Sequence, residues 1–202
     1  MNTNRQHYLN IEDTSFFELE VKKSRFLVHL TPIVDKEQAL TWVANARKQF
    51  PDARHHCWAY VLGNPQNPNA QAMSDDGEPG GTAGLPILNA IQHKNIGDVC
   101  AVVVRYFGGT KLGAGGLIRA YGGSVSRALD ACMTIEITPK IHIRFTGDFA
   151  LEQTVRHWLK IHDGALLDIQ YRENVWFEVA IDVGKKADYF AFLLAEGAVV
   201  EE

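Results

Sequence analysis

Residues 98–123, which read DVCAVVVRYFGGTKLGAGGLIRAYGG, constrain the fold more strongly than any other segment. The continuous apolar run at the start of this segment predicts a strand that is buried on both faces. The glycine-rich stretch that follows predicts a tight connection, and residues 113–133 then have the pattern of a helix. Four glycines inside that helix each destabilise it by up to about 1 kcal/mol relative to Ala, so they indicate close packing or a close ligand.

The junction between this strand and this helix has the features of an anion-binding site. The first N–H groups of a helix have no partner within it, and the helix dipole favours negative charge there. Nearby glycines let the backbone approach an anion, and two bases add positive charge. The glycine spacing matches neither common nucleotide-binding motif, so tight packing is an alternative explanation for the helix glycines. The candidate residues in the junction are Arg105, Tyr106, Gly108, Gly109, Lys111 and Gly113.

The stretch DARHHCWAY, residues 52–60, can contribute to the same surface. It predicts a strand, in which neighbouring side chains point to opposite faces, so the two adjacent histidines cannot bind one metal ion together. If this strand pairs with the strand before the glycine loop, Arg54 and one histidine share a face with Arg105. Tyr106 and Tyr121 would flank this basic surface, which suits RNA because bases stack on rings and phosphates pair with cations.

The segment SDDGEP, residues 74–79, is the acidic counterpart of this basic region. Its candidate contact residues are Ser74, Asp75, Asp76 and Glu78. Three carboxylates could bind a hard cation, but their spacing does not fit an EF-hand, so a solvated turn or acids preceding a helix are favoured. The chain contains no G-x-S-x-G, H-E-x-x-H or paired C-x-x-C pattern. We therefore expect no catalytic residues, no metal and no cofactor.

Composition limits the functions that the chain can have. The net charge of −4 argues against general coating of nucleic acids, although residues 92–129 hold five bases and a single acid. No apolar run approaches the roughly 20 residues of a membrane-spanning helix, and the N-terminus lacks a signal-peptide core. Three widely spaced cysteines favour free, mostly buried thiols. These features predict a globular cytoplasmic protein with no membrane contact.

The pattern up to residue 137 predicts one mixed domain. Residues 16–31 predict two strands joined at a polar turn. Residues 35–50 predict an amphipathic helix, in which Asp35 and Gln38 have the spacing of a capping box. Residues 64–81, rich in Asn, Pro and Gly, predict a long loop, and Thr82 is the expected cap of a helix ending near residue 93.

The pattern changes after residue 137, where glycines become rare and the predicted element order is β-α-β-β-α-β. This is the order of a ferredoxin-like split unit. The aromatic residues Trp158, Trp176, Phe190 and Phe192 are expected to pack between its helices and its sheet. We therefore predict two α+β domains, residues 1–137 and residues 138–202.

Three long motifs resemble those of the Impact/YigZ family, in its bacterial two-domain form. They read DARHHCWAYVLG, SDDGEPGGTAGLPIL and VVVRYFGGTKLGAGGLIRAYGGSV, in that order. The residues that match the family's motifs are Arg54, His55, Ser74, Asp75, Asp76, Glu78, Arg105, Tyr106, Lys111 and Arg119. The resemblance spans roughly residues 22–129, and the layout of the second domain is also similar.

The resemblance implies a fold and a link to translation. It implies a first domain like the second domain of a small-subunit ribosomal protein and the fourth of elongation factor G. The second domain would be ferredoxin-like, similar to the fifth domain of that factor. Eukaryotic relatives dampen the amino-acid-starvation kinase response by competing for its activator. Because they carry an extra N-terminal domain before the shared core, we do not expect the kinase role here.

Three functional hypotheses follow. The first is a non-enzymatic, translation-linked regulator that binds RNA or the ribosome through the basic glycine loop. The second is an enzyme or binder of a small molecule or nucleotide, with the loop holding phosphate and the acids holding a metal ion or acting as base. The third is a protein-interaction adaptor that uses the acidic residues 74–78. The absence of a catalytic pattern favours the first.

Overall fold

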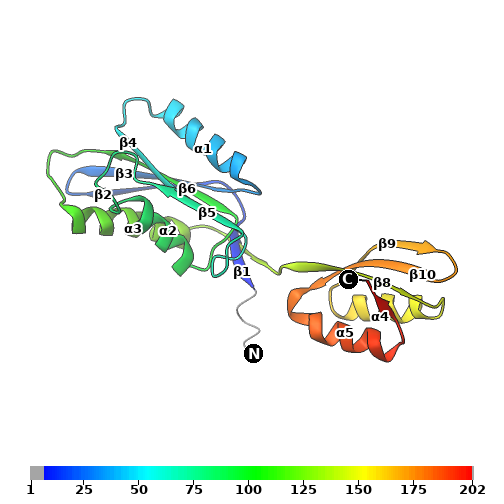
Figure 1. The fold of residues 1–202 in the computed structure, drawn as a ribbon. Coiled ribbons are helices and arrows are strands. Elements are labelled where there is room, and N and C mark those ends of the chain that lie inside the picture. The colour runs from blue at the N-terminus through cyan, green and yellow to red at the C-terminus, as the bar shows by residue number, and fades with distance from the viewer. Residues whose placement is uncertain (1–6, 202) are drawn as a thin grey trace. The chain divides into compact units, whose positions relative to one another are not determined.

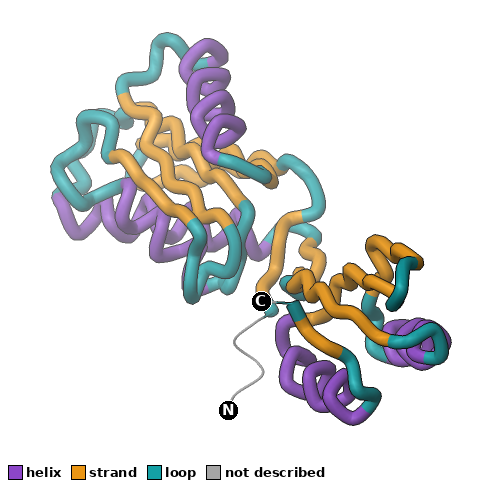
Figure 2. Tube along the Cα trace, turned by 45° about the vertical axis from the view of Figure 1, so that its right-hand side comes forward, coloured by secondary structure: helices purple, strands orange, loops and turns teal. Residues whose placement is uncertain are grey.

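The computed structural model describes residues 7–201, and these form two compact units. The larger unit comprises residues 8–137, and the smaller unit comprises His7 and residues 138–201. Each unit contains strands, helices and a hydrophobic core of its own (Figures 1 and 2). None of the helices within the described residues is both long enough and apolar enough to cross a membrane.

A five-stranded sheet forms the centre of the larger unit. In spatial order it contains β2 (Ser15–Val21), β3 (Ser24–Pro32), β6 (Val99–Tyr106), β4 (His55–Leu62) and β5 (Ala70–Ser74). Each strand pairs antiparallel with its neighbours. The apolar strand predicted before the glycine loop is β6, which lies in the middle of the sheet and is buried along nearly its whole length.

Helices cover both faces of this sheet, as Figure 1 shows: α1 (Lys36–Gln49) lies on one face, and α2 (Gly84–His93) and α3 (Ala114–Asp130) lie on the other. Alternation along β6 divides its side chains between two cores, so that Val102 packs toward α1 and Val103 packs toward α2 and α3. This double coverage explains the continuous apolar run in the sequence.

The predicted start of the first helix is confirmed. Asp35 is the N-cap residue of α1, and its side chain accepts a hydrogen bond from the Gln38 N–H at 2.8 Å. The Gln38 side chain in turn accepts from the Val34 N–H at 3.1 Å. Two donors at the helix start are therefore satisfied by side chains, close to the arrangement of a capping box.

Two local predictions are wrong. The stretch predicted as an unbroken loop contains β5, an edge strand whose residues alternate between exposed and partly buried positions. Thr82 does not cap α2, because its hydroxyl donates to the Pro79 carbonyl and the helix starts at Gly84 after Ala83. Pairing with β4 stabilises β5 although its own composition resembles a loop.

β1 (Tyr8–Ile11) and β7 (Thr134–Ile137) pair antiparallel in a short ribbon that the sequence pattern did not predict. Ile11 is buried in the core, and the Tyr8 hydroxyl donates to the Asp98 carboxylate. Strands of four residues have too few alternations to be recognised, and only this long-range pairing defines them.

The smaller unit has the predicted β-α-β-β-α-β order. Its strands are β8 (Lys140–Gly147), β9 (Ala165–Tyr171), β10 (Val175–Asp182) and β11 (Val199–Val200), and its helices are α4 (Leu151–Ile161) and α5 (Lys186–Ala195). The four-stranded sheet has the antiparallel order β11-β8-β10-β9. Its core contains the stacked rings of Phe145 and Phe177, with centroids 4.9 Å apart.

The prediction for the aromatic residues of this unit is half right. Trp158 and Phe192 pack against the core. Trp176 does not, because its neighbours along β10 point into the core and alternation directs the indole to the other face, where it donates to Glu201. Phe190 is also exposed, and the Lys186 ammonium lies 5.6 Å from the centroid of its ring.

Candidate functional site

A cavity of about 690 Å³ opens where β4, β6, the acidic loop and the start of α3 meet in the larger unit. A volume of this size is typical of sites for small ligands. Its lining residues are Asp52, Arg54, His55, Glu78, Pro79, Arg105, Tyr106, Phe107, Lys111, Leu112, Gly113, Ala114 and Leu117. Pairing of β4 with β6 places His55 directly opposite Arg105, so both reach the same face of the sheet.

The inner part of the cavity contains a buried ion pair. The Arg105 guanidinium donates from Nη1 to Glu78 Oε1 at 2.6 Å, and the Tyr121 hydroxyl donates to the same oxygen at 2.8 Å. Arg105 is 8% exposed and Glu78 is 9% exposed. The Arg105 Nε–H is buried and has no acceptor among the described residues. The site therefore contains a charged donor that the unit's own residues do not fully use.

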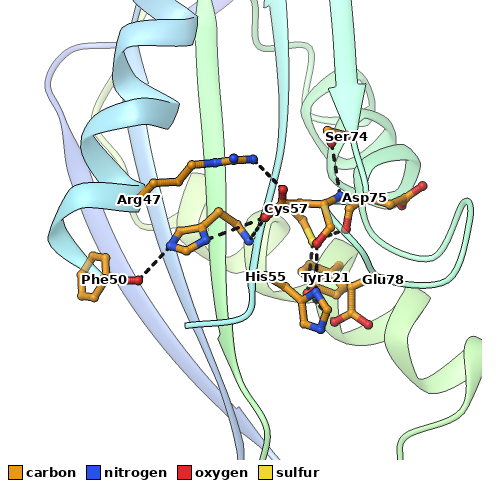
Figure 3. Close-up of polar contacts among 10 residues, drawn as sticks. Arg47, Phe50, His55, Cys57, Ser74, Asp75, Glu78 and Tyr121 are labelled. Carbon is orange, nitrogen blue, oxygen red and sulfur yellow. Dashed lines mark hydrogen bonds and ion pairs between the residues drawn. The ribbon is translucent and has the colours of Figure 1, made fainter. Parts of the chain in front are cut away.

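Tyr121 and Cys57 support this pair from behind. Burial, followed by the neighbouring Cys57 and Glu78, raises the pKa of Tyr121, so its hydroxyl stays protonated as a donor. Burial raises the pKa of the Cys57 thiol to about 12, and the sulfur lies 3.3 Å from the tyrosine oxygen. Figure 3 shows Cys57, Tyr121 and Glu78 gathered at this point. A thiol with this pKa is not a nucleophile at neutral pH.

Cationic and aromatic side chains surround the cavity. Arg54 and Lys111 are exposed, and both line it. Phe107 is 59% exposed, with its ring 5.8 Å from the Arg105 guanidinium. The Tyr106 hydroxyl donates to Asp52 at 2.9 Å, and burial followed by this carboxylate raises the tyrosine pKa. Cations and exposed rings around a cavity suit a ligand that carries both an anion and a flat apolar group.

The start of α3 forms one wall of the cavity. Its N-cap residue, Gly113, has a φ of +71° and no side chain that could cap the helix. The first N–H groups of a helix have no partner within it, so here they can bind an anion. Gly108 has a different role: its N–H donates to Ser24 Oγ, and a Cβ would lie 1.9 Å from the Lys23 carbonyl carbon. That glycine is needed for packing.

The structure brings together six of the nine residues that the sequence selected for anion binding. They are Arg54, His55, Arg105, Tyr106, Lys111 and Gly113. Gly108, Gly109 and Arg119 do not line the cavity, and Arg119 is exposed on α3. Tyr121, considered as a flank of the basic surface, is fully buried and acts through Glu78 instead.

The candidate residues of the acidic loop have different roles in the structure. Of the four, only Glu78 lines the cavity. Asp75 accepts from the N–H groups of Gly81, Ala83 and Gly84 at 2.8–2.9 Å and so caps α2. Burial by itself would raise the pKa of Asp75, but these three donors outweigh it and lower the pKa. The Asp75 carboxylate therefore has a structural role.

Asp76 and Ser74 connect the acidic loop to neighbouring elements. Asp76 accepts from Arg47 Nη2 at 2.5 Å and from the His56 N–H at 2.7 Å, which links the loop to α1 and β4. Ser74 Oγ accepts from the Asp76 N–H at 3.2 Å. Within the described residues 7–201, no group of three or more His, Cys, Asp or Glu side chains is placed to hold a metal ion.

Sequence reasoning did not foresee that Glu78 and Arg105 form a buried pair. The two residues lie 27 positions apart, and the sequence pattern predicts that both lie on the surface. One signal was available: the alternation along β6 places Arg105 on the same face as Ala101 and Val103, which are buried. Phe107, Leu112 and Leu117 were also missed, because an apolar residue in a loop or helix has no local sign of facing a cavity.

Comparisons with known proteins agree on one family. Residues 22–129 match the model of the Impact N-terminal domain, and residues 145–193 match a domain of unknown function, DUF1949. IMPACT family member YigZ of Escherichia coli is 40% identical over 86% of this chain and 85% of its own length. IMPACT family member YvyE of Bacillus subtilis is 39% identical over 87% of this chain and 80% of its own length.

A eukaryotic relative and a solved structure also match this chain. Protein IMPACT of Bos taurus is 33% identical over 46% of this chain and 29% of its own length. A crystal structure described as that of a hypothetical protein aligns with a TM-score of 0.68 at 34% identity, covering 98% of both chains. The two matched domains agree with the three sequence motifs, and the two bacterial relatives are matched over 80–85% of their own length. The chain therefore belongs to the Impact family.

Proposed function

We propose that this protein is a non-enzymatic, translation-linked regulator that binds RNA, free or within the ribosome, through the cavity in its larger unit. The observation that carries the proposal is the convergence of Arg54, Lys111 and the uncapped start of α3 around the partly unsatisfied Arg105. Such a site suits a phosphate group, and the exposed ring of Phe107 suits a base.

Family membership supports the link to translation, because the chain shares its Impact domain with eukaryotic IMPACT proteins. We further infer that the larger unit has the fold of the ribosomal-protein domain implied by the resemblance. The smaller unit would be a ferredoxin-like domain, and its strand order β11-β8-β10-β9 supports this assignment. A role in translation corresponds to a cytoplasmic location.

The proposal is tested by RNA binding at different salt concentrations. A fluorescent RNA with a stem and a single-stranded loop is titrated with the protein, and anisotropy gives Kd between 50 and 300 mM KCl. We expect affinity to fall steeply with salt, because phosphate contacts release counterions. Arg54→Ala/Lys111→Ala removes two such contacts, so the slope of log K against log salt should become smaller by roughly 1.5 to 2.

Lys36→Ala provides the matched control, because Lys36 is an exposed lysine on α1, which covers the opposite face of the sheet. This variant should bind RNA like the unmodified protein. The proposal is wrong if no RNA binds at 50 mM KCl, or if the control and the double variant lose affinity equally.

A second candidate function is favoured by the size of the cavity. A cavity of about 690 Å³ with a buried ion pair is also what a small phosphorylated molecule requires. Thermal unfolding in the presence of nucleotides, with and without Mg²⁺, separates the two candidates. Stabilisation by a nucleotide that needs Mg²⁺, in a protein that does not bind RNA, would favour the small-molecule function.

A further inference from the structure

The hydrogen-bond pattern inside the cavity leaves specific groups unused. Both donors to Glu78 converge on Oε1, and Oε2 accepts no hydrogen bond from the described residues. The Arg105 guanidinium donates a single hydrogen bond to them, through Nη1, while its Nε–H remains buried without an acceptor. A carboxylate only accepts and a guanidinium only donates. The free acceptor of Glu78 therefore lies next to the Nη2 donors of Arg105, which none of the described residues uses.

These unused groups define the chemistry of a complementary ligand. The ligand must present acceptors to Arg105 and, beside them, a donor to Glu78 Oε2. Among the four RNA bases, guanine has this order along one side, with the acceptors N7 and O6 followed by the donors N1–H and N2–H₂. Adenine places its amino donor between two acceptors, uracil places its N3–H between two acceptors, and cytosine has a single amino donor beside its acceptors N3 and O2. Guanine alone follows two acceptors with two donors, and arginine on N7 and O6 is the commonest specific base contact. The buried pair therefore matches guanine best.

The rest of the cavity fits the remaining parts of a nucleotide. Phe107 and Tyr106 line it with rings on which a base can stack. Lys111 and the start of α3 at Gly113 lie in the same lining and can bind phosphate. A cavity of about 690 Å³ has room for one nucleotide.

We infer that the cavity binds a single guanine nucleotide of an RNA, with the guanine edge on Glu78 and Arg105 and its phosphate near Lys111 and the start of α3. This inference rests on the proposed RNA-binding function and adds specificity to it. Arg105 and Glu78 select the base, whereas the exposed cations contribute affinity that does not depend on the base.

The test uses the full chain and mononucleotides of known identity. Calorimetry or NMR titration measures the affinities of GMP, AMP, CMP, UMP and ribose 5-phosphate. We expect GMP to bind at least 10-fold more tightly than the other nucleotides, because one good base-edge contact discriminates by about that factor. Equal binding of all four nucleotides, or GMP no tighter than ribose 5-phosphate, overturns the inference without any variant.

Two variants then separate base selection from phosphate binding. Glu78→Gln replaces an acceptor by an amide that can present a donor, so the preference for GMP should disappear while ribose 5-phosphate binding stays unchanged. Lys111→Ala should weaken all ligands by a similar factor and keep the preference. Glu20→Gln, on the exposed side of β2, is the control and should change neither. A preference that survives Glu78→Gln in a folded protein contradicts the role of Glu78.

The outcomes also distinguish this inference from the proposed function. Salt-dependent RNA binding with no preference among bases overturns the guanine site and leaves the RNA-binding function standing. Binding of GMP by a protein that does not bind RNA at low salt overturns both the RNA-binding function and the inference built on it.

Discussion

The pairing of Glu78 with Arg105 is difficult to explain by stability. Removing two charges from water costs several kcal/mol for each ion, and an apolar pair of similar volume is often as stable or more stable. The arrangement is incomplete as well, because the buried Nε–H of Arg105 has no acceptor within residues 7–201. A ligand that uses the remaining groups provides a functional reason for placing two charges at this position.

Another buried residue, His29, leads to a prediction about pH. His29 is 5% exposed and lies between the rings of Phe16 and Phe50, with centroid distances of 4.8 and 5.0 Å. Burial, followed by the nearby His56, lowers the pKa of His29 below its usual value of 6.5. In the unfolded chain the imidazole binds a proton near pH 6.5, whereas in the folded protein it stays neutral to a lower pH.

The unfolded state therefore binds more protons below pH 6.5, and stability should fall as the pH decreases from 7 to 5. One such group contributes at most about 1.4 kcal/mol per pH unit. His29→Leu should make this dependence shallower, although it will also change the stability at pH 7. Urea unfolding at several pH values measures both slopes, and identical slopes in the two proteins would rule out the role of His29.

Among the helices, strands and loops, the glycines that follow β6, in the loop and in α3, have different functions. A Cβ at Gly108 would collide with the backbone of Lys23 and Ser24, whereas a Cβ at Gly123 in α3 would meet nothing within 4 Å. The sequence could not separate these cases, because both glycines occur in similar glycine pairs. The difference arises because the turn from β2 to β3 lies against the loop that follows β6, where its backbone contacts Gly108.

Two alanine substitutions test this distinction. Gly108→Ala should destabilise the protein by about 2 kcal/mol or more, because backbone atoms must move to accept the new methyl group. Gly123→Ala should stabilise it by up to about 1 kcal/mol, since Ala is a better helix former than Gly. Thermal unfolding of both variants provides the comparison. Equal effects of the two substitutions would contradict the packing explanation.

At the scale of the whole molecule, each unit has its own buried core. The larger core brings the sheet together with α2 and α3, and the smaller core contains Phe145, Phe177 and residues from α4 and α5. A unit with its own core can in principle fold alone. The cavity is built entirely from residues of the larger unit.

We therefore predict that a fragment of residues 8–137 folds independently and keeps the binding properties of the full chain. Its ¹H–¹⁵N spectrum should be dispersed, its urea unfolding should be cooperative, and its RNA affinity should lie within about threefold of that of the full chain. An unfolded fragment would show that the larger unit depends on the smaller one. A folded fragment without RNA affinity would show that the cavity alone is not sufficient.

The elements with a continuous or a regularly repeating apolar pattern were predictable from the amino-acid sequence alone. The continuous apolar run became β6, the amphipathic pattern after Asp35 became α1, and the element order of the smaller unit followed its local patterns. The local pattern was sufficient there because burial, on one face of α1 and on both faces of β6, is repeated along a single element. The family motifs likewise lie in continuous stretches, so the family could be recognised without coordinates.

Which charged side chains stay available to a ligand, and which are used within the protein, depends on contacts between distant segments. Asp75 caps a helix that starts nine residues later, Asp76 binds Arg47 from another helix, and Glu78 is buried against Arg105. The three acids look equivalent in the sequence, because their roles depend on partners brought close by sheet pairing and by helix packing. Long-range pairing assigns these roles, and local composition contains no record of it.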